Sequence, residues 1–176
     1  MTTTVIDIET TNFFNNPSPY IPDNYLVSVG YRRTLDSKWS NTEYLFFKHS
    51  KKEPTPNGSR ILQDCLWNTD LLVGHNIKFD LSWLLECGFE YENEVYDTMI
   101  FEYVKAGGKK KKLDLSSCCD RRNIPIKLDV VKEYLKNGLG FETIPFEIVE
   151  EYGINDVNIT CELYEKQKEE LNEEYN

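Results

Sequence analysis

The hydrophobic and polar positions of the chain follow a strand period in some segments and a helix period in others. Thr4–Glu9 is rich in β-branched residues and carries only the charges of Asp7 and Glu9, which predicts a central strand buried on both faces. Residues 71–75 form a second short apolar run of this kind. Helical spacing begins at Ile77 and continues to Cys87. A second helical stripe near the C-terminus contains Ile148, Tyr152, Ile159 and Leu163.

Two further alternating segments precede the first predicted helix. Residues 26–31 and 42–47 are predicted to be the second and third strands of an antiparallel meander. A meander followed by alternating helix and strand predicts an α/β fold with a mixed sheet and helices on both faces. The segment Asn12–Asp23 contains three prolines and several asparagines, so neither a helix nor a strand is expected there.

Four carboxylates occupy positions where a core normally has apolar residues. Asp7 and Glu9 project to the same side of the predicted strand, because strand side chains alternate. Asp80 and Asp156 fall inside the two helical stripes. An unpaired buried carboxylate costs several kcal/mol, so a cation or strong hydrogen bonds must compensate it. Four such acids predict about two divalent cations, and carboxylate oxygens favour Mg²⁺ or Mn²⁺.

Three short segments around these acids resemble the exonuclease motifs of the DnaQ-like 3′ to 5′ exonucleases. They are Asp7-Ile8-Glu9, Gly74-His75-Asn76-Ile77-Lys78-Phe79-Asp80 and Tyr152-Gly153-Ile154-Asn155-Asp156. A tyrosine four residues before the last aspartate is typical of the DEDDy branch. The sister DEDDh branch has a histidine where this chain has Glu151. The resemblance extends over nearly the whole chain and is strongest to the proofreading domains of family A DNA polymerases.

Each motif alone is weak in a chain with 30 acidic residues. Their order, their spacing of about 70 residues and their placement on a strand and two helices make the resemblance specific. It implies a ribonuclease H-like fold with five strands and the first strand in the middle. It also implies that the four acids bind two metal ions and that Tyr152 positions the attacking hydroxide. The catalytic residues that it implies are Asp7, Glu9, Asp80, Tyr152 and Asp156.

The resemblance also implies contacts with the substrate. Asn76 and the backbone near Thr10 would hold the terminal nucleotide, and Asn76 would share a face with Asp80 if the turn between them is helical. Phe13 lies four residues after the motif glutamate, where the family has an apolar residue that wedges between the last bases. Phe13 could instead only anchor its loop to the core. His75 is expected to be a structural residue rather than a substrate contact.

The expected activity is the release of nucleoside 5′-monophosphates from single-stranded DNA 3′ ends, either free-standing or in trans with a separate DNA polymerase. One alternative is a ribonuclease D-like 3′ to 5′ exoribonuclease. A second alternative, from another class, is a non-catalytic nucleic-acid-binding domain that assists a polymerase. A virus that encodes the two activities separately is one plausible source, and the host cytoplasm would then be the location.

Composition restricts these expectations further. A chain of 176 residues with 40% hydrophobic content predicts one domain over residues 1–176. A net charge of −10 argues against a protein that grips duplex DNA over a wide surface. The lysine loop, residues 105–112, has five lysines and either guides the incoming strand or is only solvated. The early first strand and the lack of long apolar runs predict a cytoplasmic protein without signal peptide or membrane segment. The five cysteines are expected to be reduced thiols.

Overall fold

The computed structural model describes residues 1–126 and 130–175, and a mixed sheet lies at its centre. Strand β1 occupies the middle, where it pairs antiparallel with β2 and parallel with β5. The six strands of the described residues form a sheet that is five strands wide, because β3 and β4 both pair with β2. The two-residue β3 is added to the expected five. The strands are β1 (Thr3–Thr10), β2 (Leu26–Leu35), β3 (Lys38–Trp39), β4 (Glu43–Phe46), β5 (Leu71–Gly74) and β6 (Glu94–Asp97).

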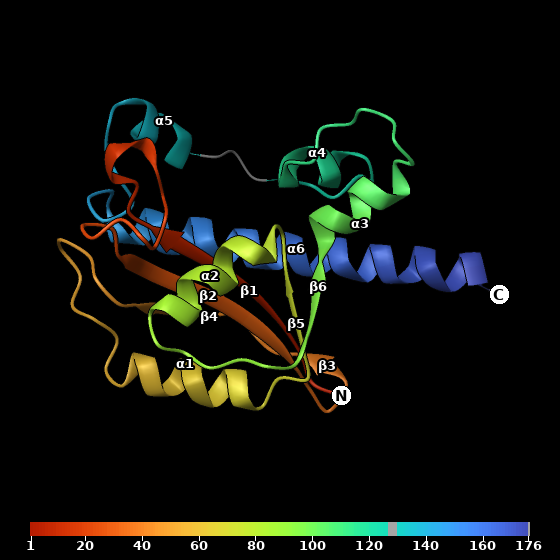
Figure 1. Cartoon of the computed structure of the whole chain (residues 1–176), viewed down its shortest axis with the longest axis horizontal. Helices are drawn as coiled ribbons and strands as arrows, with labels where there is room; N and C mark the ends of the chain where they lie inside the picture. The colour runs from red at the N-terminus through yellow and green to blue at the C-terminus, as the bar shows by residue number, and fades with distance from the viewer. Residues whose placement is uncertain (127–129, 176) are drawn as a thin grey trace.

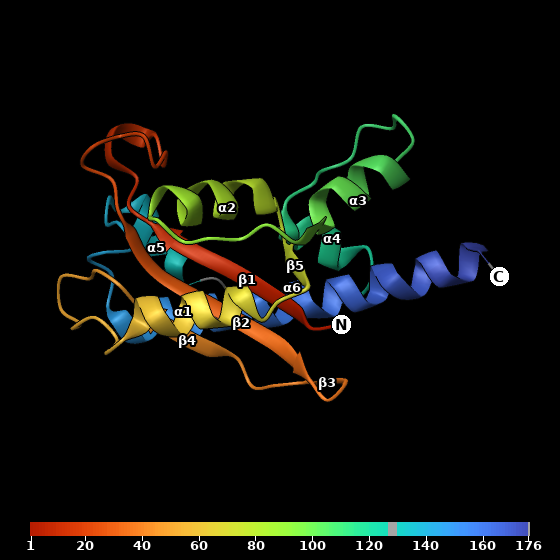
Figure 2. The same cartoon turned by 60° about the horizontal axis from the view of Figure 1, so that its bottom comes forward.

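Helices cover both faces of this sheet, which confirms the predicted α/β architecture. Helices α1 and α2 lie on one face and the long helix α6 runs across the other (Figures 1 and 2). The loop after β1 contains one short 3-10 turn, η1 (Phe13–Asn15), and is otherwise irregular as predicted. The α-helices are α1 (Gly58–Trp67), α2 (Ile77–Glu86), α3 (Thr98–Lys105), α4 (Leu115–Asp120), α5 (Val131–Lys136) and α6 (Phe146–Tyr175).

Alternation along β1 divides the core into two layers. Ile6 and Ile8 pack in one cluster with residues of α1 and α2, such as Leu62. Val5 packs in a second cluster with Val157 of α6. Asp7 and Glu9 are at the same parity as Val5, so β1 directs both acids toward the α6 face. The apolar residues of β1 thus fix the direction in which its acids point.

A charged network fastens α3 and the end of α4 to α6. Glu102 of α3 is buried, forms an ion pair with Arg121 at 2.7 Å and accepts a hydrogen bond from Gln167 at 2.9 Å. Arg122 forms an ion pair with Glu170 of α6 at 2.7 Å, and Lys105 pairs with the same carboxylate. Because each buried charge has a partner, the network can hold three helices together without leaving a charge uncompensated.

Two further sequence expectations concern the cysteines and the apolar character of the helices. All five cysteines are free thiols, and four of them are buried as small core residues. Within residues 1–126 and 130–175, none of the helices combines the length and apolar character needed to cross a bilayer.

Helix α6 packs unusually closely on the sheet next to Tyr44 of β4. A Cβ atom built on Gly153 would lie only 2.6 Å from the Tyr44 hydroxyl oxygen. A Cβ on Gly30 of β2 would lie 3.0 Å from Val157 Cγ2. The Tyr44 hydroxyl donates to the Val149 carbonyl of α6 at 3.2 Å and accepts from Ser28 Oγ at 2.8 Å. Glycine at 153 therefore lets α6 rest directly on a hydrogen-bonded tyrosine.

Replacing Gly153 with alanine should force α6 away from Tyr44 and destabilise the fold by about 1–3 kcal/mol, the usual cost of overpacking a core. Urea unfolding measures this as a lower midpoint with an unchanged slope. Gly58→Ala is the matched control, because a Cβ there meets its nearest neighbour at an ordinary 3.5 Å. Equal stability of Gly153→Ala and the wild type would show that the close approach is unimportant.

Candidate active site

The site begins with the two acids of the central strand. Glu9 is only 7% exposed, and Asp7 is partly exposed toward the α6 side. The register between β1 and β2 shifts between Glu9 and Thr10, so the strand becomes irregular immediately after the second acid. Such a bulge at the end of a strand redirects the chain. The loop that follows β1 therefore starts beside the site.

Asp80 joins these acids from α2. Its side chain is 4% exposed and accepts a hydrogen bond from the backbone N–H of Ile8 at 3.2 Å. This bond ties the first turn of α2 to β1 between the two strand acids. Burial raises the pKa of Asp80 to about 8, although the Ile8 N–H acts in the opposite direction.

Helix α6 supplies Asp156 and Tyr152, which lie one turn apart. Burial is the main cause that raises the pKa of the Tyr152 hydroxyl, followed by the charges of Glu9, Asp156 and Asp7. A hydrogen bond with Asp156 contributes in the same direction. Tyr152 is therefore a neutral hydrogen-bond donor surrounded by carboxylates.

The aspartates of three separate elements share one region. The pKa of Asp7 is raised well above its ordinary value, first by burial and then by the charges of Asp156 and Asp80. The structure thus brings together the residues that the sequence motifs indicated, from β1, α2 and α6. In the described part of the chain, no three His, Cys, Asp or Glu side chains are arranged so that they could hold a metal ion. The assignment of the acids as metal ligands therefore stays a prediction.

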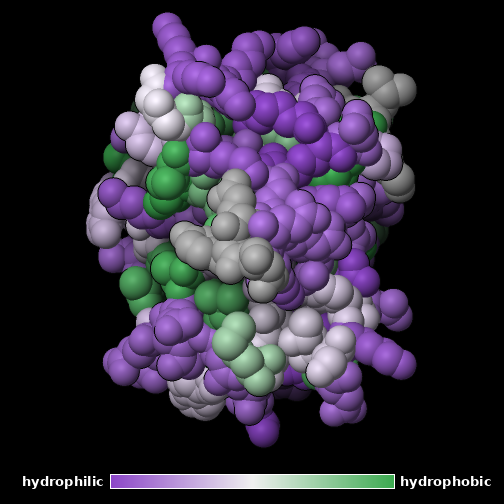
Figure 3. All heavy atoms as spheres, turned by 90° about the vertical axis from the view of Figure 1, so that its right-hand side faces the viewer, coloured by the Kyte–Doolittle hydropathy of each residue, from purple (hydrophilic) through white to green (hydrophobic). Residues whose placement is uncertain are grey.

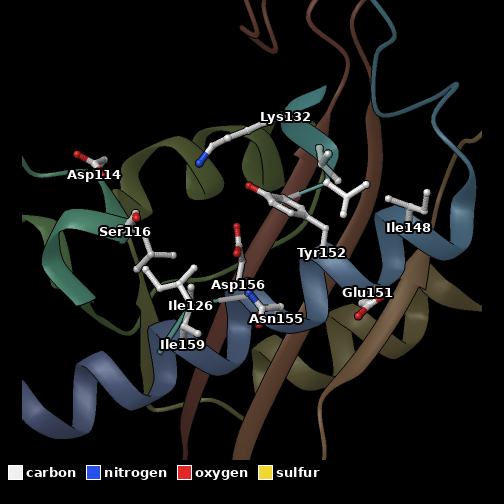
Figure 4. A pocket seen from close by; sticks show the side chains of 13 residues that line it. Asp114, Ser116, Ile126, Lys132, Ile148, Glu151, Tyr152, Asn155, Asp156 and Ile159 are labelled. Atoms are coloured by element: carbon white, nitrogen blue, oxygen red, sulfur yellow. The ribbon is translucent and has the colours of Figure 1, made fainter. Parts of the chain in front are cut away.

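A cleft of about 620 Å³ opens beside Tyr152 and Asp156, between α6, α5 and the start of α4 (Figure 4). Apolar side chains such as Ile148 and Ile159 line much of it, and Lys132 of α5 points into it (Figure 4). Sequence reasoning missed Lys132, because a single lysine on a six-residue helix has no distinctive pattern. The cleft offers an apolar wall, one cation and the acidic edge of the site.

The three predicted substrate contacts, Thr10, Phe13 and Asn76, differ in burial and backbone conformation. Thr10 is buried at the end of β1, and Phe13 is 36% exposed with its ring edge-on to Tyr25. Asn76 is exposed and left-handed, with φ at 63°, so the turn before Asp80 is not helical there. The condition under which Asn76 would share a face with Asp80 is therefore not met. Its backbone N–H instead donates to Asp97 Oδ1 at 3.0 Å.

His75 has the structural role that was expected. One ring nitrogen is 2.9 Å from Thr98 Oγ1 and the other is 2.8 Å from the Leu113 carbonyl oxygen. A neutral imidazole satisfies both, with Nε2 as the donor to the carbonyl and Nδ1 as the acceptor. Burial lowers the pKa of His75, which favours this neutral form. His75 thus joins the end of β5 to the start of α3 and to the segment that follows the lysine loop.

The lysine loop lies at the end of the molecule that carries α3 and the C-terminus of α6. Lys109, Lys110, Lys111 and Lys112 are all exposed, between α3 and α4. Figure 3 shows hydrophilic side chains over the upper part of this end, where the loop lies in Figure 1. Asp114, Leu115 and Ser116 follow the lysines after Leu113 and line the cleft. The loop therefore leads into one wall of the cleft.

Comparison with known proteins places the chain in a family. Residues 29–172 match the 3′–5′ exonuclease family of the DNA polymerase A type, a range that includes Asp80, Tyr152 and Asp156. The chain belongs to this 3′–5′ exonuclease family and is an enzyme of the nuclease class. Asp7 and Glu9 lie before the matched range, so their place in the site rests on the structure. No curated protein sequence matches the chain.

Solved nuclease structures share the fold. The apo form of a nuclease has a TM-score of 0.65 and 16% identity, and the match covers 98% of this chain and 74% of that one. NrnC of Brucella melitensis with bound Mg²⁺ has a TM-score of 0.63 and 16% identity over the same shares of the two chains. NrnC bound to pGG has a TM-score of 0.62 and 17% identity, also covering 98% and 74%. This likeness confirms the predicted ribonuclease H-like fold.

The raised pKa of Asp80 predicts how the metal-free protein responds to pH. The folded state keeps a proton on Asp80 up to about pH 8, whereas the unfolded chain releases it near pH 3.8. Stability is therefore lost as pH rises toward 8, by up to about 1.4 kcal/mol per pH unit. In EDTA, Tm should therefore fall as the pH rises from 6.5 to 8. Each kcal/mol of lost stability lowers Tm by about 2–4 °C.

Asp80→Asn should flatten this slope, because the amide does not titrate. His75 has the opposite pH dependence, because its lowered pKa makes the folded state lose stability when the pH falls below about 6.5. Measurements above pH 6.5 avoid this effect. Thermal unfolding followed by circular dichroism measures both proteins. An identical slope in the variant would exclude Asp80 as the titrating group.

Proposed function

We propose that the protein hydrolyses single-stranded DNA from its 3′ end and releases nucleoside 5′-monophosphates. The observation that carries this proposal is the meeting of aspartates from β1, α2 and α6, where burial and then the charges of Asp156 and Asp80 raise the pKa of Asp7. Fixed carboxylates that repel one another need protons or cations to become stable. A cation that neutralises them is also what a phosphodiester requires in order to approach.

The chemistry of the donors fits two hard cations, Mg²⁺ or Mn²⁺. Asp7, Glu9, Asp80 and Asp156 offer only carboxylate oxygens, which such ions prefer. Asp7 is the best candidate for a shared ligand, because both other aspartates act on it. Asp80 already accepts the Ile8 N–H, which suits contacts through water. When bound, a pair of ions activates water and stabilises the departing 3′ oxygen. NrnC, which shares this fold, has a structure with bound Mg²⁺.

Side chains of this protein would orient the reacting groups. Tyr152 keeps its proton because burial and three carboxylates raise its pKa, so its hydroxyl donates a hydrogen bond and does not act as a base. Lys132 points into the cleft, where its ammonium group can bind a phosphate oxygen. Ile148 and Ile159 form an apolar wall that suits the sugar and base of the last nucleotide.

The proposed substrate contacts are close in sequence to Glu9 or Asp80. Thr10 follows Glu9 directly, and its backbone would hold the terminal nucleotide. Phe13 is 36% exposed, which permits the wedge role between the last bases. Asn76 is exposed before α2 and offers its side-chain amide to the same nucleotide.

A 3′ to 5′ exoribonuclease is a second candidate, and one specific observation favours it. NrnC, which shares the fold, has a structure bound to pGG. We place DNA first because the matched family is of the DNA polymerase A type. A separate polymerase that uses this protein as its proofreading unit stays part of the proposal.

The proposal is tested with labelled oligonucleotides and Mn²⁺ or Mg²⁺. Single-stranded DNA should be shortened from its 3′ end faster than blunt duplex DNA, and RNA of the same sequence should be degraded more slowly still. Gel analysis of 5′-labelled strands shows the direction and the ranking. Faster cleavage of RNA would replace DNA with RNA as the substrate. No cleavage of either substrate would overturn the nuclease proposal.

Tyr152→Phe keeps the ring in α6 but removes the donated hydrogen bond. We expect kcat to fall by about 10- to 1,000-fold, the range for one positioning or charge-stabilising contact. Tm and KM should stay near the wild-type values, because the packing surface is unchanged. Tyr134→Phe of α5 is the matched control and should leave kcat unaffected. Full activity of Tyr152→Phe would remove this hydroxyl from the mechanism.

A further inference from the structure

Two exposed aromatic side chains lie on the loop that follows β1. Within residues 12–24, Phe14 is 80% exposed and Tyr20 is 72% exposed. Large apolar side chains left in water commonly mark a binding surface when they gather on one segment. The only charged residue of this segment is Asp23, so the loop has no cation with which to bind phosphates. Its chemistry favours a ligand with flat apolar faces.

The backbone at Phe14 is strained, and burial of its side chain does not compensate this strain. Phe14 has φ at 61° and Asn15 has φ at 55°, both in the left-handed region. A bulky residue rarely adopts this conformation, because its Cβ is crowded there. Phe14 gains no burial in return. Strain without a gain in packing is commonly found at functional positions.

Hydrogen bonds hold the loop in this shape. Asn24 accepts the Phe13 N–H at 2.9 Å and donates to the carbonyls of Asn16 at 2.6 Å and Ser18 at 3.0 Å. The indole N–H of Trp83 in α2 donates to the Pro17 carbonyl at 2.9 Å. The loop is therefore organised before any ligand binds, which reduces the entropy lost on binding.

The position of the loop connects it to the acidic site. Phe14 follows Glu9 by only five residues, so their Cα atoms lie at most about 18 Å apart. Lys48 lies next to the base of the loop, with its ammonium 3.8 Å from the centre of the Tyr25 ring. Aromatic rings with a neighbouring lysine are the surface that proteins use to bind single-stranded nucleic acid without sequence preference.

We propose that Phe14, together with Tyr20, stacks on bases of the single strand upstream of the nucleotide being removed. This inference rests on the proposed exonuclease function and adds a second binding region outside the cleft. Phe14 would contact bases, and Lys48 would contact the phosphates beside them. The platform would engage a strand of several nucleotides and not a single nucleotide.

Binding is measured in EDTA, where no cleavage is expected, by fluorescence anisotropy of an end-labelled eight-nucleotide oligothymidylate. Phe14→Ala should weaken binding by about 5- to 100-fold, the loss of one stacked base, whereas Phe14→Trp should retain it. The same oligonucleotide with abasic sites upstream of its last two bases should bind wild type and Phe14→Ala equally. Trp67→Ala is the matched control, an aromatic residue of α1 that is 62% exposed.

Unchanged affinity of Phe14→Ala for oligothymidylate and oligouridylate would overturn the platform and leave a protein contact as the role of the exposed rings. Equal weakening on the abasic strand would also overturn it, because the lost contact would not involve bases. The p-nitrophenyl ester of thymidine 5′-monophosphate separates the two proposals, since it contains one nucleotide. Its Mn²⁺-dependent hydrolysis by wild type, and not by Asp7→Asn, would uphold the exonuclease site whatever the binding result.

Discussion

Repulsion between carboxylates held in a poorly hydrated region is the constraint on which this structure depends. The strand that carries Asp7 cannot rotate, because Ile6 and Ile8 anchor it in one core layer and Val5 anchors it in the other. Asp80 cannot retreat either, since the Ile8 N–H holds its carboxylate. The apolar core therefore maintains an arrangement of charge that would otherwise disperse. Holding these acids together costs stability as long as no proton or cation compensates them.

Close packing also determines how α6 docks on the sheet. Glycines at 30 and 153 remove the side chains that would separate the helix from the sheet, and the Tyr44 hydroxyl contacts the Val149 carbonyl. The Tyr44 ring thus sets the distance between α6 and the sheet. Tyr152 and Asp156 depend on this distance, because they flank or follow Gly153 on the same helix. The contact between Gly153 and Tyr44 therefore fixes both the packing of α6 on the sheet and the position of Tyr152 and Asp156.

Much of the fold could be predicted from the sequence, because its elements follow from periodicity, whereas the order of the strands and the roles of the acids were implied by the resemblance of three motifs. The β-branched run of β1 and the helical stripes around Asp80 and Asp156 led to the elements that the structure shows. Features that depend on contacts between distant segments were not predictable. Lys132 reaches the cleft only through the placement of α5. The left-handed turn at Asn76 and the strain at Phe14 depend on local hydrogen bonds that residue types do not specify.

The charged network around Glu102 and Glu170 has a consequence for engineering. Both ends of the lysine loop are fastened, at Lys105 through Glu170 and at Leu113 through His75. Lengthening a loop whose ends are fixed costs little entropy, since that cost grows only with the logarithm of length. Residues 107–110 are therefore a suitable point for inserting a fluorophore tag or a tethering peptide. Such a handle would sit outside the cleft without disturbing the helix that carries Asp156.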